Sequence, residues 1–105
     1  MRGKYKTNIE RIMEKALAKA NIKVIYDFPI RCKWGYRIDF AIPEIKLGIE
    51  CDGEKWHLEN NRKDRFRDKF LNEIGWTILR FRGMQIEHNI NECINKVKTM
   101  LEATK

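Results

Sequence analysis

Two β-rich runs separated by only three residues constrain the fold of this chain more than any other feature. The runs cover residues 36–42 and 46–51, and Pro43-Glu44-Ile45 separates them. A connection this short joins antiparallel strands, because parallel strands need a crossover of about a dozen residues or more. The sequence therefore predicts an antiparallel hairpin.

Helices and two further strands are predicted on either side of this hairpin. Thr7 and Glu10 have the spacing of a capping box, which predicts the start of an amphipathic helix that runs to about residue 20. Gly75 follows a narrow apolar stripe in residues 61–74 and predicts the end of a second helix. The other predicted elements are a strand at residues 22–28, a strand at 76–81 that returns beside 46–51, and one last helix carrying Ile86, Ile90, Ile94, Val97 and Leu101.

This order of elements, α-β-β-β-α-β-α, predicts an α/β protein of the α+β type. Its small mixed sheet is flanked by helices, since each apolar face must be buried against another element. Neither a linker nor an internal repeat interrupts the chain, so we expect residues 1–105 to form a single domain.

The charge of the chain favours nucleic acid as a partner. Among 105 residues, 22 Lys and Arg against 15 Asp and Glu give a net charge of +7. Basic domains gain affinity for phosphates through counterion release, although charge alone says nothing about chemistry. No apolar run approaches the roughly 18 residues that span a bilayer, so we expect no membrane association.

The three cysteines form neither a disulfide framework nor a zinc site by their spacing. Cys32, Cys51 and Cys93 are odd in number and include no C-x-x-C pair. Reduced thiols fit the cytoplasm best, and we expect the protein to be cytoplasmic.

Three acidic residues in the hairpin are the strongest candidates for a functional site. Asp39 interrupts a strand between two apolar residues, which natural strands rarely allow without a reason. Glu50 and Asp52 share one face of the next strand because side chains alternate along it. With Asp39 on the neighbouring strand, the three carboxylates can converge, and they then repel one another unless a cation lies among them. Mg²⁺ is a hard cation that fits oxygen ligands. The alternative is a solvated sheet face on which the acids pair with Arg37 or Lys46.

The segment after the hairpin adds a histidine, a tryptophan and a basic helix. His57 follows Asp52 by five residues and is placed to act as a general acid or base, although a lone loop histidine is more often a surface or capping residue. Trp56 either stacks on a base or caps the core. Asp64, in the first turn of the helix, is placed to reach back toward His57; the alternative is a solvated helix with local ion pairs.

Six motifs in order make the chain resemble a known group of nucleases. It looks like the very-short-patch-repair nucleases and is similar to other small endonucleases of the PD-(D/E)-x-K superfamily, including the EDxHD homing endonucleases of phage introns. The resemblance covers about residues 7–100. It rests on Glu10, Tyr36-Arg37-Ile38-Asp39-Phe40, Gly48-Ile49-Glu50-Cys51-Asp52-Gly53, Trp56-His57, Asp64-Arg65 to Arg67-Asp68, and Gly75-Trp76-Thr77-Ile78-Leu79-Arg80-Phe81.

The resemblance implies a restriction-endonuclease-like core that hydrolyses DNA phosphodiesters with Mg²⁺, or with Mn²⁺ in its place. It assigns the metal to Asp39 and the backbone carbonyl of Cys51, with Glu50 and Asp52 as further ligands. A metal stabilises charge on the phosphoryl oxygens while a base activates water. The expected catalytic residues are Glu10, Asp39, Glu50, Asp52, His57 and Asp64, and the expected DNA contacts are Arg37, Lys55, Trp56, Arg62, Lys63 and Arg65.

Three departures from the family pattern bear on these expectations. Asp52 stands where the repair enzymes have a second histidine, so either Asp52 or His57 is the general base. The E-x-K lysine is replaced in Glu50-Cys51-Asp52, and Lys55 is a candidate for the missing charge. No set of Cys and His residues follows Gly53, so we expect no zinc.

The expected protein is a DNA endonuclease or its catalytic domain, in a bacterial or phage-type context. A chain of 105 residues holds a nuclease core and little else. We therefore expect double-stranded DNA to be recognised through a further DNA-binding domain of a longer protein, a partner or a homodimer. Two alternatives stay open: a non-catalytic nucleic-acid-binding module with a degenerate nuclease core, and an RNA-directed nuclease on the same fold.

Overall fold

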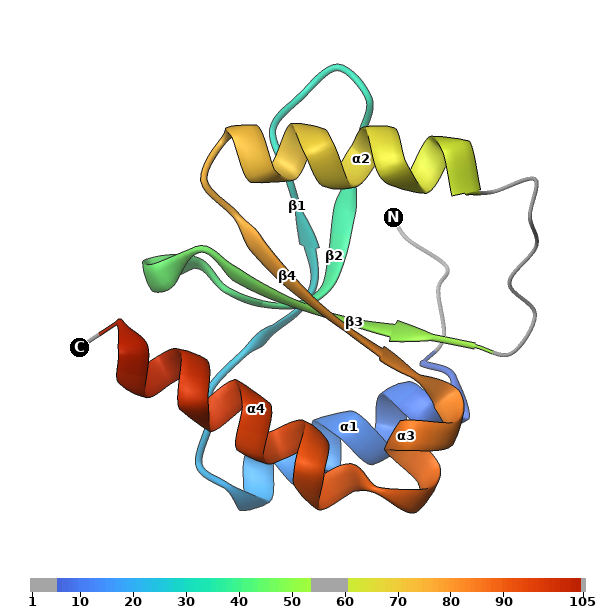
Figure 1. The fold of residues 1–105 in the computed structure, drawn as a ribbon, viewed down its shortest axis with the longest axis vertical. Coiled ribbons are helices and arrows are strands. Elements are labelled where there is room, and N and C mark those ends of the chain that lie inside the picture. Colours follow the sequence, from blue (N-terminus) through green and yellow to red (C-terminus); the bar gives the residue numbers. More distant parts are fainter. Residues whose placement is uncertain (1–5, 54–60, 105) are drawn as a thin grey trace.

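The chain folds around one four-stranded mixed sheet, which Figure 1 shows between two layers of helices. The structure is a computed structural model that describes residues 6–53 and 61–104, with side chains from residue 65 onward in the second range. The strands β1 (Ile25–Pro29), β2 (Arg37–Ile42), β3 (Leu47–Asp52) and β4 (Thr77–Arg82) lie side by side in that order. The first three are antiparallel, and β4 is parallel to β3. The predicted hairpin and the return of the fourth strand beside it are thus confirmed.

Helices cover both faces of the sheet and divide the apolar core into two clusters. α2 (Asn61–Glu73) covers one face, and α1 (Asn8–Lys19), α3 (Gly83–His88) and α4 (Ile90–Ala103) cover the other (Figure 1). The larger cluster, on the side of α1, α3 and α4, consists of Met13, Leu17, Ile22, Phe40, Ile42, Leu47, Ile49, Phe81, Ile86, Cys93, Ile94 and Val97. The smaller cluster, on the side of α2, consists of Ile30, Ile38, Ala41, Leu71 and Trp76. Within the described residues, no helix combines the length and the apolar character needed to cross a membrane.

The predicted ends of two helices are confirmed. The Glu10 N–H donates to Thr7 Oγ1 at 3.2 Å, and the Thr7 N–H donates to Glu10 Oε1 at 2.9 Å, which completes the capping box at the start of α1. Gly75 follows α2 with a φ of +97°, a conformation that favours glycine. The N–H groups of Gly75 and Trp76 donate back to the last turn of the helix, as in a Schellman motif.

Two other boundaries differ from the prediction. Ile22 still closes α1, because Asn21 adopts a φ of +60° and the Ile22 N–H donates to the Leu17 carbonyl at 2.9 Å; β1 therefore begins only at Ile25. The single last helix is wrong, since Asn89 leaves the helical conformation (φ −137°, ψ 43°) and separates α3 from α4. Asparagine is common at helix ends. The even apolar spacing across this residue concealed the break, and the order becomes α-β-β-β-α-β-α-α.

The paired strands β1 and β2 change which face of the sheet their side chains occupy between two neighbouring residue pairs. Tyr26 and Phe40 lie opposite each other and pack in the larger cluster, with ring centroids 5.4 Å apart. Phe28 and Ile38, the next pair along the two strands, pack in the smaller cluster on the other face. In a regular strand residues two apart share a face, so the ladder twists between these pairs. Asp39 lies at the twist, which explains how a carboxylate interrupts two fully buried neighbours.

Candidate active site

The carboxylates of Asp39 and Glu50 lie beside each other at the end of the β2–β3 ladder. The ladder runs to the pair of Phe40 with Ile49. Beyond it, the Asp39 N–H donates to Glu50 Oε2 at 3.0 Å, and the Cys51 N–H donates to Asp39 Oδ2 at 2.9 Å. Side-chain oxygens thus take the place of backbone carbonyls as acceptors. As a result, both carboxylates are fixed in position where the two strands separate.

Arg67 of α2 binds Glu50 from the helix side of the sheet. Its Nη2 donates to Glu50 Oε2 at 3.0 Å and to the Arg37 carbonyl at 2.7 Å. Only 13% of the Arg67 side chain and 12% of the Glu50 side chain are exposed. The Tyr36 ring lies against the guanidinium, 6.0 Å from its carbon to the ring centroid. Because a buried charge is costly without a partner, each of the two side chains depends on the other.

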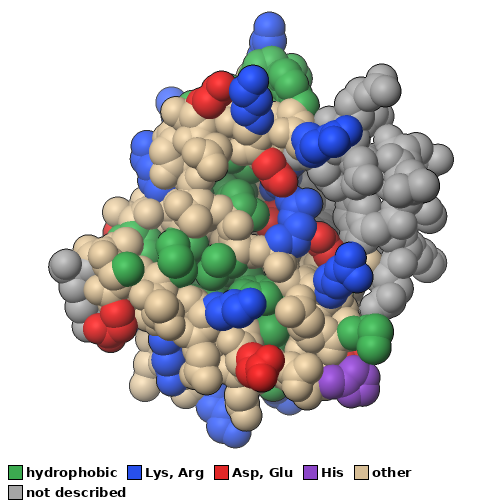
Figure 2. Space-filling view, in the orientation of Figure 1, with side chains coloured by type: hydrophobic (Ala, Val, Ile, Leu, Met, Phe, Trp, Pro, Cys, Tyr) green, Lys and Arg blue, Asp and Glu red, His purple; other side chains and the backbone are tan. Residues whose placement is uncertain are grey.

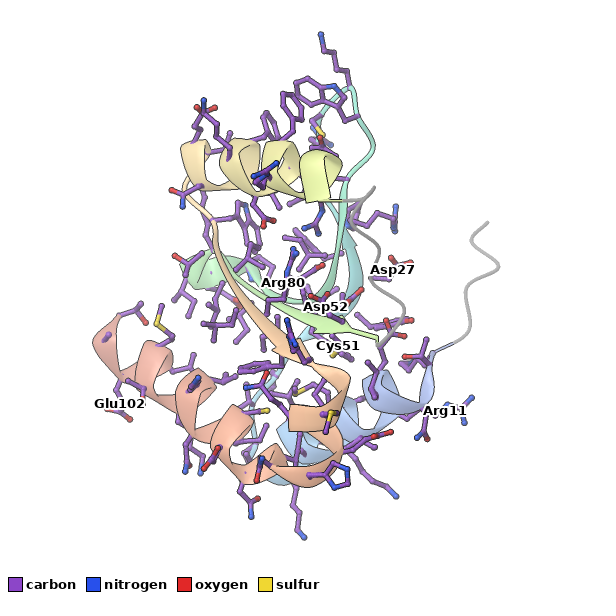
Figure 3. All side chains as sticks on the ribbon, turned by 45° about the vertical axis from the view of Figure 1, so that its right-hand side comes forward. Arg11, Asp27, Cys51, Asp52, Arg80 and Glu102 are labelled. Carbon is purple, nitrogen blue, oxygen red and sulfur yellow. The ribbon has the colours of Figure 1, made fainter. Side chains whose placement is uncertain are left out.

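A second arginine, Arg80 of β4, connects Asp52 to α2. Arg80 Nε lies 3.5 Å from Asp52 Oδ2, and Arg80 Nη2 donates to Asp68 Oδ1 at 3.1 Å. Figure 3 shows Asp52 and Arg80 together in the middle of the molecule, with Cys51 close by on β3. In Figure 2, acidic and basic side chains alternate between α2 and β3. Glu50 and Asp52 thus share the face of the sheet beneath α2, as predicted, and each is held by its own arginine.

Five charged side chains on this face are joined by ion pairs, and we call them the charged layer. They are Glu50, Asp52, Arg67, Asp68 and Arg80.

The Cys51 thiol is affected by the charges of four of the predicted acids. Burial raises its pKa, and the negative charges of Asp39, Glu10, Glu50 and Asp52 raise it further. These acids come from α1, β2 and β3. Charges that lie as far as 42 positions apart in the sequence, between Glu10 and Asp52, thus act on the same thiol.

Among the acids whose side chains the structure describes, Glu10 is the most deeply buried, with 3% of the residue exposed. Its carboxylate accepts the Thr7 N–H, and the Tyr26 hydroxyl donates to it at 3.2 Å. The N-terminus of α1 also favours a negative charge at this point. Glu10 thus fixes the start of α1 against β1.

Burial raises the pKa of Glu50 to about 7, and the neighbouring Asp39 carboxylate contributes to the rise, while Arg67 opposes it. This carboxyl group therefore takes up a proton far more readily than an exposed glutamate. A cation bound beside it would favour the charged form.

Several predicted site residues lie outside the part of the chain that the structure describes. Two of the residues predicted to contact DNA have side chains that the structure describes. Arg37 is held by Asp27, whose Oδ1 accepts from Arg37 Nε at 2.9 Å, and Arg65 is exposed. Lys46, the other proposed partner of the acids, donates instead to the Ile74 carbonyl at 3.0 Å. Outside the described residues or side chains lie Lys55, Trp56, His57, Arg62, Lys63 and Asp64.

The oxygen ligands around Asp39 suit a hard divalent cation. Asp39 and Glu50 could supply carboxylates, the ligand type that Mg²⁺ and Mn²⁺ prefer. Among the side chains that the structure describes, no group of three His, Cys, Asp or Glu residues is arranged to hold a metal. Asp39 and Glu50 could hold Mg²⁺ through one or two carboxylate bonds, with water as the other ligands, as this ion is commonly bound in proteins.

Sequence reasoning assigned no role to Arg67 and Arg80, two cations that the described part of the chain places at the candidate site. Arg67 precedes the buried Leu71 by four residues, so both lie on one stripe of α2, and this spacing is a usable signal. Arg80 pairs with Glu50 in the parallel register of β3 and β4. That register depends on tertiary structure, so the partner of Arg80 has no local signal.

The fold is similar to that of a solved nuclease domain. The catalytic domain of the homing endonuclease I-Bth0305I matches this chain with a TM-score of 0.67 and 24% sequence identity. The match covers 92% of this chain and 92% of that domain, so the two share a fold over most of their length.

Curated relatives match over parts of their length. Two uncharacterized proteins of Haemophilus influenzae are 32% and 33% identical over 68 and 67 residues, which is 64% of this chain in both cases. An uncharacterized protein of Mycobacterium tuberculosis is 36% identical over 56 residues, or 50% of this chain. The matched parts make up 56%, 42% and 21% of these three relatives, so this chain spans about half of their length or less.

A family model matches almost the entire chain. The model is that of the restriction-endonuclease-like family REase_MTES_1575, and it covers residues 9–101. This range includes all four strands and the residues of the charged layer. The chain therefore belongs to the REase_MTES_1575 family and is a PD-(D/E)-x-K nuclease-like protein.

Proposed function

We propose that this chain is a divalent-metal-dependent DNA endonuclease domain that hydrolyses phosphodiester bonds. The observation that carries the proposal is the pair of Asp39 and Glu50, two adjacent carboxylates fixed at the end of the β2–β3 ladder. Family membership supports a nuclease, and the name of the structural neighbour, a homing endonuclease, supports DNA as the substrate. The net charge of +7 suits a phosphate-rich partner.

In this proposal Asp39 and the Cys51 carbonyl hold Mg²⁺ or Mn²⁺, with Glu50 as a further ligand. The bound ion supplies Lewis-acid stabilisation of negative charge on the phosphoryl oxygens. The Cys51 N–H, 2.9 Å from Asp39 Oδ2, keeps the Asp39 carboxylate in one orientation. Arg67, 3.0 Å from Glu50, supplies a positive charge beside the acid pair, where the superfamily pattern has a lysine.

Asp52 and His57 are the two candidates for the base that takes a proton from the attacking water. Asp52 lies within 3.5 Å of Arg80 and so has a fixed place in the charged layer. Asp64 is the proposed support of His57, and Glu10 is the acid contributed by α1. General base catalysis contributes about 10²- to 10⁴-fold, so the larger loss between Asp52→Asn and His57→Ala identifies the base.

The biological role that we propose is that of a catalytic domain, either homing-type or very-short-patch-repair-like. Two relatives support a domain within a longer protein, since the matched part makes up 42% and 21% of their length. Recognition of the target would then come from a further DNA-binding domain or from a second copy of the chain.

Cleavage of supercoiled plasmid in Mg²⁺ or Mn²⁺ tests the proposal. Asp39→Asn keeps the shape of the side chain and an oxygen that can accept the Cys51 N–H, but removes the charge. We expect its cleavage rate to fall by about 100-fold or more. Glu87→Gln, at an exposed acid of α3, makes the same chemical change away from the site and is expected to cut like the parent.

Three results would contradict parts of the proposal. If the parent binds DNA but fails to cut it with either divalent ion, the protein is a non-catalytic binding module. Faster cleavage of an RNA of the same sequence would make the protein an RNA-directed nuclease. If Asp39→Asn cuts as fast as the parent, Asp39 does not belong to the active site.

A further inference from the structure

Two aromatic side chains, Trp34 in the β1–β2 loop and Phe66 on α2, lie next to each other on the surface. Of these residues, 43% of Trp34 and 50% of Phe66 are exposed. Their rings meet edge to face with centroids 5.2 Å apart. Neither residue belongs to the two clusters of the core. Packing of the core therefore does not explain why these two apolar side chains lie together on the surface. Adjoining exposed apolar side chains often mark a binding surface.

Two half-buried rings hold the exposed pair in place. Trp34 stacks on Tyr36 with an interplanar angle of 17° and a centroid distance of 5.8 Å. It also meets Phe70 edge to face at 4.9 Å. Tyr36 and Phe70 in turn pack against the smaller core cluster. We call Trp34, Tyr36, Phe66 and Phe70 the aromatic platform, and its rings are oriented before any ligand binds, which lowers the entropy cost of binding.

The surroundings of the platform are basic. Lys33 Nζ lies 5.1 Å over the centroid of the Trp34 ring. Arg31 on the same loop and Arg65 and Lys69 on α2 are exposed. Residues 30–36 contain two basic residues and no acidic one. Surface aromatic rings among cations are the composition with which proteins bind single-stranded nucleic acid, because bases stack on the rings and phosphates meet the cations.

The platform adjoins the candidate active site through a shared residue. Tyr36 stacks on Trp34, and the same ring lies 6.0 Å from the guanidinium carbon of Arg67. Arg67 in turn binds Glu50 at 3.0 Å. A nucleic acid strand on the platform would therefore lie beside the strand end that carries the acid pair.

We propose that the aromatic platform binds an unpaired nucleobase of a single-stranded DNA segment, with Lys33 and Arg65 at its phosphates. In a duplex the base faces are hidden in the stack, so an unpaired base is the occupant that these rings can stack on. A duplex with a single-stranded flank then becomes the preferred substrate. That consequence for cleavage rests on the proposed function, whereas the binding of single strands does not.

The test measures the affinity for a labelled oligothymidylate of about 12 nucleotides, a length within the range of known single-strand sites. Phe66→Ala keeps a good helix former, and Trp34→Leu keeps an apolar side chain over Phe70. We expect each to weaken binding by about 5-fold or more, the loss of one stacked base. Met84→Ala removes a side chain of a residue that is 61% exposed on α3 and is expected to bind like the parent.

A second assay tests the proposed function separately. It measures how fast the parent cuts a plain duplex and a duplex with a single-stranded flank. Failure to cut either duplex refutes the nuclease proposal, while the oligothymidylate affinities still decide the role of the platform. Unchanged affinity in both Phe66→Ala and Trp34→Leu overturns the inference. If these variants instead change the sedimentation of the protein and leave DNA binding untouched, the surface is a protein interface and the inference is again overturned.

Discussion

The two faces of the sheet differ in what fills the space between sheet and helices. On the side of α1, α3 and α4, the larger cluster is apolar and includes fully buried Met13, Phe40 and Val97. On the side of α2, the smaller cluster is followed by the charged layer, in which only 12% of the Glu50 side chain and 13% of the Arg67 side chain are exposed. One face thus resembles an ordinary core, and the other carries charge in a position where charge is costly.

This difference separates the residues that stabilise the fold from those that form the site. Burial of apolar area stabilises a protein wherever it occurs. A buried ion pair does not reliably do so, because desolvation offsets the attraction. The charged layer is therefore better explained by the chemistry of the site than by the stability of the fold, and variants on the two faces should have different consequences.

The largest expected effect lies on the apolar face. Phe40→Ala leaves a cavity under α1, and we expect the free energy of unfolding to fall by about 3 to 5 kcal/mol. Urea denaturation measures the change. The control is Ile25→Ala on the neighbouring strand, where 49% of the residue is exposed and the expected loss is below about 1 kcal/mol. Equal losses in the two variants would contradict the larger cluster as the main source of stability.

On the charged face, Arg67→Ala is expected to lower the free energy of unfolding by about 3 kcal/mol, because it leaves Glu50 buried without its cation. Arg65→Ala, at an exposed arginine of the same helix, is the matched control and should cost less than about 0.5 kcal/mol. The double variant Arg67→Met with Glu50→Gln removes both charges, and we expect it to recover much of the loss. If the double variant is no more stable than Arg67→Ala, the cost does not come from an unpaired carboxylate.

Much of the fold could be predicted from the sequence because its signals are local. The three-residue connection fixed the antiparallel hairpin, and Thr7, Glu10 and Gly75 fixed helix ends through their own hydrogen bonds and φ angles. The break at Asn89 was missed because apolar spacing reports which face is buried and not whether the helix is continuous. A residue that ends one helix and starts the next leaves that spacing intact.

The site was predictable only in part. Asp39 stands out locally, because a carboxylate between two apolar residues conflicts with a regular strand, and the twist of β1 and β2 explains the conflict. The pairing of Glu50 with Arg67 and of Asp52 with Arg80 depends on how α2 and β4 are placed on the sheet. No sequence period encodes those contacts, so the cations of the site could not be assigned from the sequence.

A smaller effect is expected at Gly48, beside which Ile38 and Ile78 of the smaller cluster pack. A Cβ atom there would lie 2.7 Å from Ile78 Cδ1 and 2.9 Å from Ile38 Cγ2. We expect Gly48→Ala to lower the free energy of unfolding by about 1 to 3 kcal/mol through overpacking. Adding Ile78→Val removes the methyl group that is met first and should recover part of this loss in the same denaturation assay. A double variant no more stable than Gly48→Ala would place the conflict at Ile38 instead.

The smallest expected effect, taken per pH unit, is a pH dependence that only the charged face should show. Because the folded protein raises the pKa of Glu50 from an ordinary value of 4.5 to about 7, the folded state keeps a proton that the unfolded chain has lost. The stability contributed by this group is therefore fully present below about pH 4.5 and declines as the pH rises to about 7, by at most about 1.4 kcal/mol per pH unit. Urea denaturation between pH 4.5 and 8 should give a free energy of unfolding that falls with pH for the parent and falls less for Glu50→Gln, whose side chain does not titrate.

Phe40→Ala is the control, and it shifts the whole curve downward without changing its slope, since its cavity contains no titrating group. A steeper decline in Glu50→Gln than in the parent would mean that Arg67 outweighs burial and Asp39 at this carboxylate.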